Sequence, residues 1–137
     1  MMTTIFHLAF KVKDLKSTKD FYHTLLGCKL GRETEHWVDI DFFGHQLSPH
    51  VSDNIPEIDY CGKVETLEVP IPHFGCILKT EDFNDIKQRL LNSNVEFVFK
   101  PQTRYKGQKG EQQTMFVLDY SNNSIEFKSF THPEEVF

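Results

Sequence analysis

Apolar and polar residues alternate along the first stretch of the chain with the period of a β-strand. Within residues 5–12, Phe6 and Phe10 fall on one side of the predicted strand and His7 falls on the other. A helix is predicted to follow, from Asp14, a good N-cap residue, to about residue 26. The same alternation predicts three further strands in this half of the chain, over residues 28–34, 37–43 and 45–51.

The same order of elements returns in the second half of the chain. The pattern predicts a strand over residues 73–78, a helix from Asp82 to about Asn94, and strands over residues 95–100, 114–118 and 124–130. Loop-forming residues dominate residues 53–71, which we interpret as a linker. A β-α-β-β-β order that occurs twice indicates an internal repeat. We therefore expect one α+β domain over residues 1–137, with module one at about 4–52 and module two at about 72–130.

Composition narrows the class of protein and its partners. The chain has 137 residues, enough for one domain, and its net charge of −5 argues against a nucleic-acid partner. No apolar run approaches the ~20 residues of a membrane span, and the first residues lack a secretory signal. The three cysteines are an odd number without CxxC spacing, which fits a reducing compartment. We expect a cytoplasmic protein with a small-molecule partner, no nucleic acid and no membrane.

Three metal-competent residues lie on predicted strands between apolar neighbours: His7, His73 and Glu126. Each therefore points away from the apolar face of its strand. If the two halves pack through their opening strands, the three side chains converge on one face of the sheet. Two imidazoles and one carboxylate are the ligand set of non-haem Fe(II) oxygenases. Taken singly, each residue is better explained as an ordinary solvated surface residue, and only the joint pattern favours a metal site.

A fourth candidate ligand lies in the strand predicted over residues 45–51. Gln46 and His50 share one face of this strand because they are an even number of residues apart. Either side chain could reach the centre, and His50 is favoured. In the alternative interpretation both residues line a wet cleft without binding metal.

Residues for substrate contact are predicted mainly after Pro101, in a polar stretch. Arg104 could meet an anionic substrate, and Tyr105 could hydrogen-bond a phenol or an enolate. Gln112 enters the next strand and is predicted to face the site. Trp37 could form an aromatic wall of the site or a partner surface. The alternative for the stretch is a solvated hairpin loop.

Several separate segments resemble the vicinal oxygen chelate superfamily, which includes glyoxalase I, bleomycin and fosfomycin resistance proteins and extradiol dioxygenases. The segments are FHLAFKVKDL from Phe6, PHFG from Pro72, TMFVLD from Thr114 and NNSIEFK from Asn122. The stretch WVDIDFFGHQ from Trp37 resembles small, single-chain, dioxygenase-like members. The resemblance covers about residues 5–130.

This resemblance implies two βαβββ modules that form an open, cup-shaped mixed sheet around a divalent metal, with helices on the outer face. His7, His73 and Glu126 match the ligand positions of the family. A remaining ligand position falls near His50; it is occupied in glyoxalase-like members and vacant in extradiol dioxygenases. Edge strands that need covering also favour a homodimer.

Three functions follow as hypotheses. The first is oxygenation of a catechol-like substrate on Fe²⁺, with Mn²⁺, Zn²⁺ and Ni²⁺ as alternative metals and with His50 as acid or base. The second is a glyoxalase-like isomerase or lyase in which the metal stabilises an enediolate. The third is a metal-free protein that binds a small molecule such as a drug.

Overall fold

The computed structural model describes residues 3–55 and 57–137. Residues 1 and 2 of the expected domain, and residue 56 of the expected linker, lie outside this part of the chain. The chain divides into two compact units. The first runs up to Glu57 and includes Tyr120–Asn123, and the second comprises Ile58–Asp119 and Ser124–Phe137.

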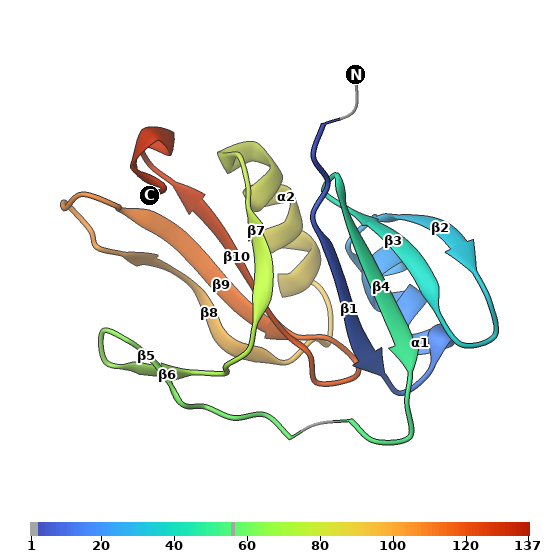
Figure 1. Cartoon of the computed structure of the whole chain (residues 1–137). Coiled ribbons are helices and arrows are strands. Elements are labelled where there is room, and N and C mark those ends of the chain that lie inside the picture. The colour runs from blue at the N-terminus through green and yellow to red at the C-terminus, as the bar shows by residue number, and fades with distance from the viewer. Residues whose placement is uncertain (1–2, 56) are drawn as a thin grey trace. The chain divides into compact units, whose positions relative to one another are not determined.

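The first unit is a mixed four-stranded sheet with one helical segment. Its elements are β1 (His7–Val12), α1 (Leu15–Lys19), the π-helical η1 (Asp20–Leu25), β2 (Lys29–Glu33), β3 (Val38–Phe42) and β4 (His45–Val51) (Figure 1). The strand order is β1-β4-β3-β2, with β1 parallel to β4 and the other pairs antiparallel. Leu8, Phe10 and Val12 are the more buried residues of β1, as the alternation predicts.

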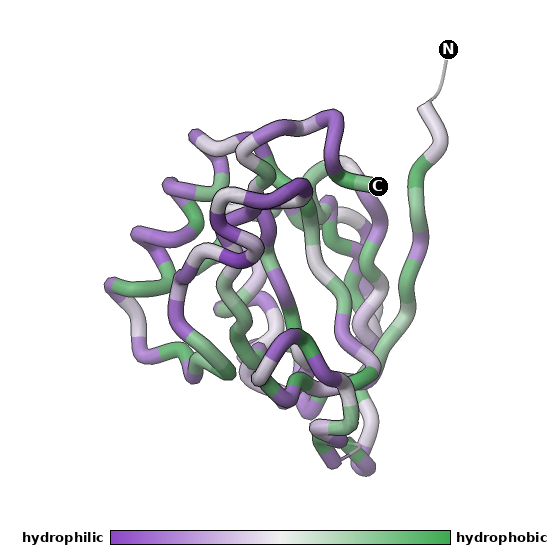
Figure 2. Tube along the Cα trace, turned by 90° about the vertical axis from the view of Figure 1, so that its left-hand side faces the viewer, coloured by the Kyte–Doolittle hydropathy of each residue, from purple (hydrophilic) through white to green (hydrophobic). Residues whose placement is uncertain are grey.

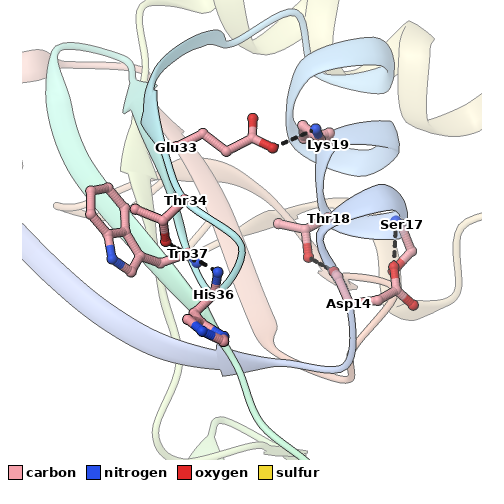
Figure 3. A network of polar contacts seen from close by, with 8 residues as sticks. All are labelled: Asp14, Ser17, Thr18, Lys19, Glu33, Thr34, His36 and Trp37. Atoms are coloured by element: carbon pink, nitrogen blue, oxygen red, sulfur yellow. Dashed lines mark hydrogen bonds and ion pairs between the residues drawn. The ribbon is translucent and has the colours of Figure 1, made fainter.

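The first helix begins where the sequence predicts. The carboxylate of Asp14 accepts a hydrogen bond of 2.6 Å from the backbone N–H of Ser17 (Figure 3). The helical segment ends near residue 26, as predicted, but beyond Lys19 it is π-helical. There the bonding widens, so that the N–H of Leu26 donates to the carbonyl of Phe21, five residues earlier. Gly27 ends the segment with φ of 80°.

The second unit repeats the topology of the first. Its elements are β5 (Gly62–Val64), β6 (Leu67–Val69), β7 (Phe74–Ile77), α2 (Thr80–Leu91), β8 (Phe97–Arg104), β9 (Gln112–Leu118), β10 (Ser124–Phe130) and the 3-10 turn η2 (Pro133–Glu135). The strand order β7-β10-β9-β8 matches that of the first sheet, with β7 parallel to β10. The two sheets confirm the predicted repeat of βαβββ modules and the α+β class.

Three predictions for the second unit need correction. The expected linker contains the β5–β6 hairpin, whose strands of three residues are too short for periodicity to reveal. Helix α2 begins at Thr80 rather than Asp82. Strand β8 continues through Pro101 because register shifts in the β8–β9 pair accommodate the missing N–H.

The core of the second unit lies between its sheet and α2. Phe83, Ile86 and Leu90 of α2 are buried, and along this helix the hydrophobic residues recur with its turns (Figure 2). Ile125 and Phe127 of β10 are fully buried. The residue between them, Glu126, therefore projects from the opposite face of the sheet. None of the described helices is long and apolar enough to cross a membrane.

Candidate metal centre

His73 and Glu126 approach each other in the second unit. The Nε2 atom of His73 lies 3.5 Å from Oε1 of Glu126. The Nδ1–H group of His73 donates a 2.7 Å hydrogen bond to the carbonyl of Pro70. Because that carbonyl can only accept, Nδ1 carries the proton of the neutral ring, and Nε2 then has a lone pair for a metal. In the protonated ring Nε2–H faces Glu126 as a donor instead. Thr114 of β9 donates a 2.6 Å hydrogen bond to Oε2 of Glu126, which leaves Oε1 facing His73.

Electrostatics couple this pair. A hydrogen bond to Glu126 is the main cause that raises the pKa of His73, against the opposing effect of burial. Burial alone would raise the pKa of Glu126. This effect of burial is outweighed by hydrogen bonds from His73 and Thr114 and by the charge of Lys128. The pKa of Glu126 therefore lies below its ordinary value. Glu126 is therefore a carboxylate at neutral pH, the state in which it can bind a cation.

Close contact between β7 and β10 fixes the position of Glu126. Gly75 of β7 pairs with Glu126 of β10, and a Cβ atom added at Gly75 would overlap the carbonyl oxygen of Glu126. Only glycine allows this approach. The groove beside the pair has a volume of about 200 Å³ and is lined by residues that include His73, Cys76, Glu126 and Lys128. The alternation of apolar and polar residues does not reveal the role of Gly75. A glycine inside a predicted strand is nevertheless a recognised signal of close backbone approach.

His7 lies in the first unit beside Gln46. The two residues pair across β1 and β4, and Nδ1 of His7 lies 2.8 Å from Oε1 of Gln46. The amide nitrogen of Gln46 donates to Asp39 at 3.4 Å, which orients the amide oxygen toward His7. Ser48 holds the other oxygen of Asp39 with a 2.7 Å hydrogen bond. This network places the proton of His7 on Nδ1 and leaves Nε2 as the metal-competent nitrogen.

Of the two candidates for a fourth position, the structure places Gln46 against His7. His50 pairs with Lys11 instead, four residues farther along β4. At ~3.3 Å per residue this is about 13 Å from Gln46. His50 is exposed, and its ring lies 6.2 Å from that of Trp37. The even spacing alone could not distinguish the two, because it predicts the face of a strand and not the register of its neighbour.

The predicted substrate residues occupy different surroundings. Arg104 and Gln112 are buried and pair across β8 and β9. Tyr105 is exposed and has a left-handed backbone with φ of 54°, where β8 ends and the turn begins. Trp37 lies in the first unit, with the guanidinium of Arg32 at 5.8 Å from its ring.

The chemistry of the His73–Glu126 pair fits a divalent metal. Donor atoms that share an ion at about 2.1 Å each lie roughly 3.0–3.4 Å apart, close to the 3.5 Å between Nε2 and Oε1. The Pro70 carbonyl and Thr114 supply the outer hydrogen bonds that metal-binding His and carboxylate groups usually have. Within residues 3–55 and 57–137, no group of three or more His, Cys, Asp or Glu side chains is gathered closely enough to hold a metal.

Comparison with known proteins places the chain in a family. The model of the Glyoxalase/Bleomycin resistance protein/Dioxygenase superfamily matches residues 4–127. A glyoxalase/bleomycin resistance protein/dioxygenase from Alicyclobacillus acidocaldarius is 32% identical, covers 98% of this chain and 96% of its own, and superposes with a TM-score of 0.82. The fosfomycin resistance protein FosX from Listeria monocytogenes shares the fold at 18% identity, with 99% and 100% coverage and a TM-score of 0.73. The chain therefore belongs to the Glyoxalase/Bleomycin resistance protein/Dioxygenase superfamily.

Proposed function

We propose that this protein is a metal-dependent enzyme whose small substrate binds a divalent metal through two adjacent oxygen atoms. The proposed ligands are His7, His73 and Glu126, and the proposed reaction is oxygenation of a catechol-like substrate with Fe²⁺. The observation that supports the proposal best is the state of the two histidines. Each has Nδ1 engaged by an oxygen acceptor, which leaves Nε2 as the nitrogen for the metal.

The number of protein ligands favours oxygenation. Two histidines and one carboxylate leave coordination positions open for a chelating substrate and a co-substrate. Bound there, the metal would act as a Lewis acid toward the substrate oxygens and as a redox centre. The hydrogen bond from Thr114 orients Glu126, and Gln46 orients His7. The acid or base role of His50 and the hydrogen bond from Tyr105 to the substrate remain predictions.

A second candidate, a glyoxalase-like isomerase or lyase, is favoured by the position of Gln46. Its side-chain oxygen lies 2.8 Å from Nδ1 of His7. A rotation of the amide would offer this oxygen as a fourth ligand, which suits stabilisation of an enediolate better than binding of O₂.

An oxygen electrode separates the two reactions. Protein reconstituted with Fe²⁺ under argon is mixed with catechols and then exposed to air. Oxygen consumption that depends on both protein and catechol supports oxygenation, and it should fall at least 100-fold in Glu126→Ala. No consumption, together with proton exchange at a 2-hydroxycarbonyl compound on Zn²⁺- or Ni²⁺-loaded protein, would instead support the isomerase or lyase.

We propose further that the chain acts as a homodimer. Strand β1 is the edge strand of its own sheet, and Ile5 and Phe6, which immediately precede it, are 50% and 61% exposed. Exposed apolar side chains at a sheet edge favour association. Light scattering should give a mass of twice 16.1 kDa for the wild type and a shift toward the monomer for Phe6→Ser.

A further inference from the structure

Arg104 is a buried cation that uses only part of its hydrogen-bonding capacity. Its side chain is 10% exposed, and Nη1 lies 3.5 Å from Oε1 of Glu65 in the turn of the β5–β6 hairpin. Its Nε and Nη2 atoms are buried and have no hydrogen-bond partner among the residues that the structure describes. A buried charged donor without an acceptor destabilises the folded state. These two atoms therefore indicate that an acceptor comes from outside the chain.

The two unpartnered atoms form one edge of the guanidinium group. Their N–H bonds lie in one plane and point in nearly the same direction, which matches the two oxygens of a carboxylate. Glu65 contacts the other side of the group, at Nη1. A water molecule could accept one of the two bonds but would supply no negative charge. The edge thus fits a planar anion with two oxygens better than a solvent molecule.

The strand register places Arg104 on the same face of the second sheet as Glu126. Arg104 pairs with Gln112, and the next residue of β9 on that face is Thr114, which donates to Glu126. Phe99 and Arg104 are an odd number of residues apart, which in a regular strand would put them on opposite faces. The register shift between them brings both side chains to the same face, and the guanidinium lies 5.2 Å from the ring centre of Phe99.

Aromatic rings connect Arg104 with His73 along this face. The ring centres of Phe99 and Phe116 are 5.5 Å apart, and those of Phe116 and His73 are 4.8 Å apart. Phe116 is fully buried, whereas Phe99 keeps some exposure. A ligand that reaches both ends of this row needs an anionic group at Arg104 and an apolar body beside Phe99.

We infer that the substrate of this protein carries a carboxylate, which binds the Nε and Nη2 edge of Arg104 while Glu65 contacts Nη1. One guanidinium supplies one positive charge, and the nearby Glu65 carboxylate disfavours a dianion such as phosphate. The metal-binding end of this substrate rests on the proposed function, whereas the carboxylate site needs no metal.

Arginine Nε–H resonances in ¹⁵N NMR spectra of the metal-free protein test the inference, with benzoate as the probe. The Arg104 resonance is assigned by its loss in Arg104→Lys. We expect a saturable shift of this resonance with a Kd of roughly 1–10 mM for so small a probe. Arg104→Lys should abolish the corresponding shifts of the Phe99 backbone amide. Lys106→Gln, a control in the exposed turn, should bind benzoate as the wild type does.

A second variant tests the effect of the Glu65 charge on the proposed site. Glu65→Gln removes the internal carboxylate and should tighten benzoate binding roughly two- to fivefold, the range of an exposed ion pair. No saturable shift up to 50 mM benzoate, weaker binding by Glu65→Gln, or tighter binding of inorganic phosphate than of benzoate would overturn the inference. Because the titration uses metal-free protein, its failure leaves metal binding intact, and a failure of metal binding leaves the benzoate result intact.

Discussion

Nε2 of His73 lies 3.5 Å from Oε1 of Glu126, and the other polar atom of each side chain is hydrogen-bonded to a separate part of the second unit. The Pro70 carbonyl fixes the imidazole and the Thr114 hydroxyl fixes the carboxylate. The pair is therefore preorganised by groups that are not themselves proposed metal ligands. Each of these groups can be tested separately.

Thr114→Val should weaken metal binding while it preserves the fold. Valine has nearly the shape of threonine but cannot donate to Oε2 of Glu126. We expect a roughly 10-fold loss of metal affinity, measured by competition with a chromogenic chelator. Thr103→Val, at an exposed position of β8, is the matched control and should bind as the wild type does. Equal affinities in the two variants would show that Thr114 has no part in orienting the carboxylate.

Gly75→Ala should destabilise the second unit strongly. The new Cβ would have to displace the backbone of Glu126, which cannot move without breaking the β7–β10 pairing. We expect a loss of about 2–4 kcal/mol in the free energy of unfolding, measured with urea. Gly31→Ala is the control, because its Cβ would lie 3.3 Å from a side-chain atom of Asp39. A loss for Gly75→Ala as small as that of the control would contradict the close approach of the two strands.

Asp14→Ala should reveal a pH-dependent helix cap. The hydrogen bond from the Ser17 backbone, with further Ser17 and lysine contributions, lowers the pKa of Asp14 in the folded protein. A lowered folded-state pKa gives stability that is present above the unfolded-state pKa and is lost as pH falls through the folded-state value. The wild type should exceed Asp14→Ala by about 1 kcal/mol at pH 7, and the difference should shrink below about pH 4.

Asp14→Asn provides the comparison for this cap, since an amide oxygen can also accept from Ser17. Urea unfolding at pH 7 should place it near the wild type. An Asp14→Ala deficit that stays constant from pH 7 to pH 3 would mean that the ionised carboxylate is not the stabilising form.

The three cysteines should differ widely in reactivity. Cys61 is exposed, Cys28 is buried, and burial raises the pKa of the Cys76 thiol to about 11. Only the thiolate attacks a disulfide reagent, so at pH 8 one thiol per chain should react quickly with a chromogenic disulfide. Cys61→Ser should remove this fast phase. A fast phase that survives in Cys61→Ser would place an accessible thiolate at Cys28 or Cys76.

The faces of the strands could be predicted from the sequence alone. Glu126 lies between the buried residues Ile125 and Phe127, so alternation correctly assigns it to the face opposite the helix. Asp14 and Gly27 likewise mark the ends of the first helical segment through local chemistry, although the π-helical bonding between them depends on packing that no local pattern reveals.

Pairing between distant strands could not be predicted. Gln46 rather than His50 lies beside His7 because of the register of β1 and β4, which is a tertiary property. The buried state of Arg104 depends on a register shift in β8 and on a hairpin that the sequence presents as a linker. The polar stretch after Pro101 therefore predicts the kind of side chain available but neither its burial nor its partners.

Elemental analysis of protein purified without chelators or metal-affinity resin tests the central claim most directly. The wild type, His7→Ala and Glu126→Ala are compared after identical reconstitution with Fe²⁺ under argon and desalting. The account predicts close to one iron per chain in the wild type and little in either variant, with circular dichroism spectra unchanged. Full occupancy in either variant, or no metal taken up by the wild type, would contradict it.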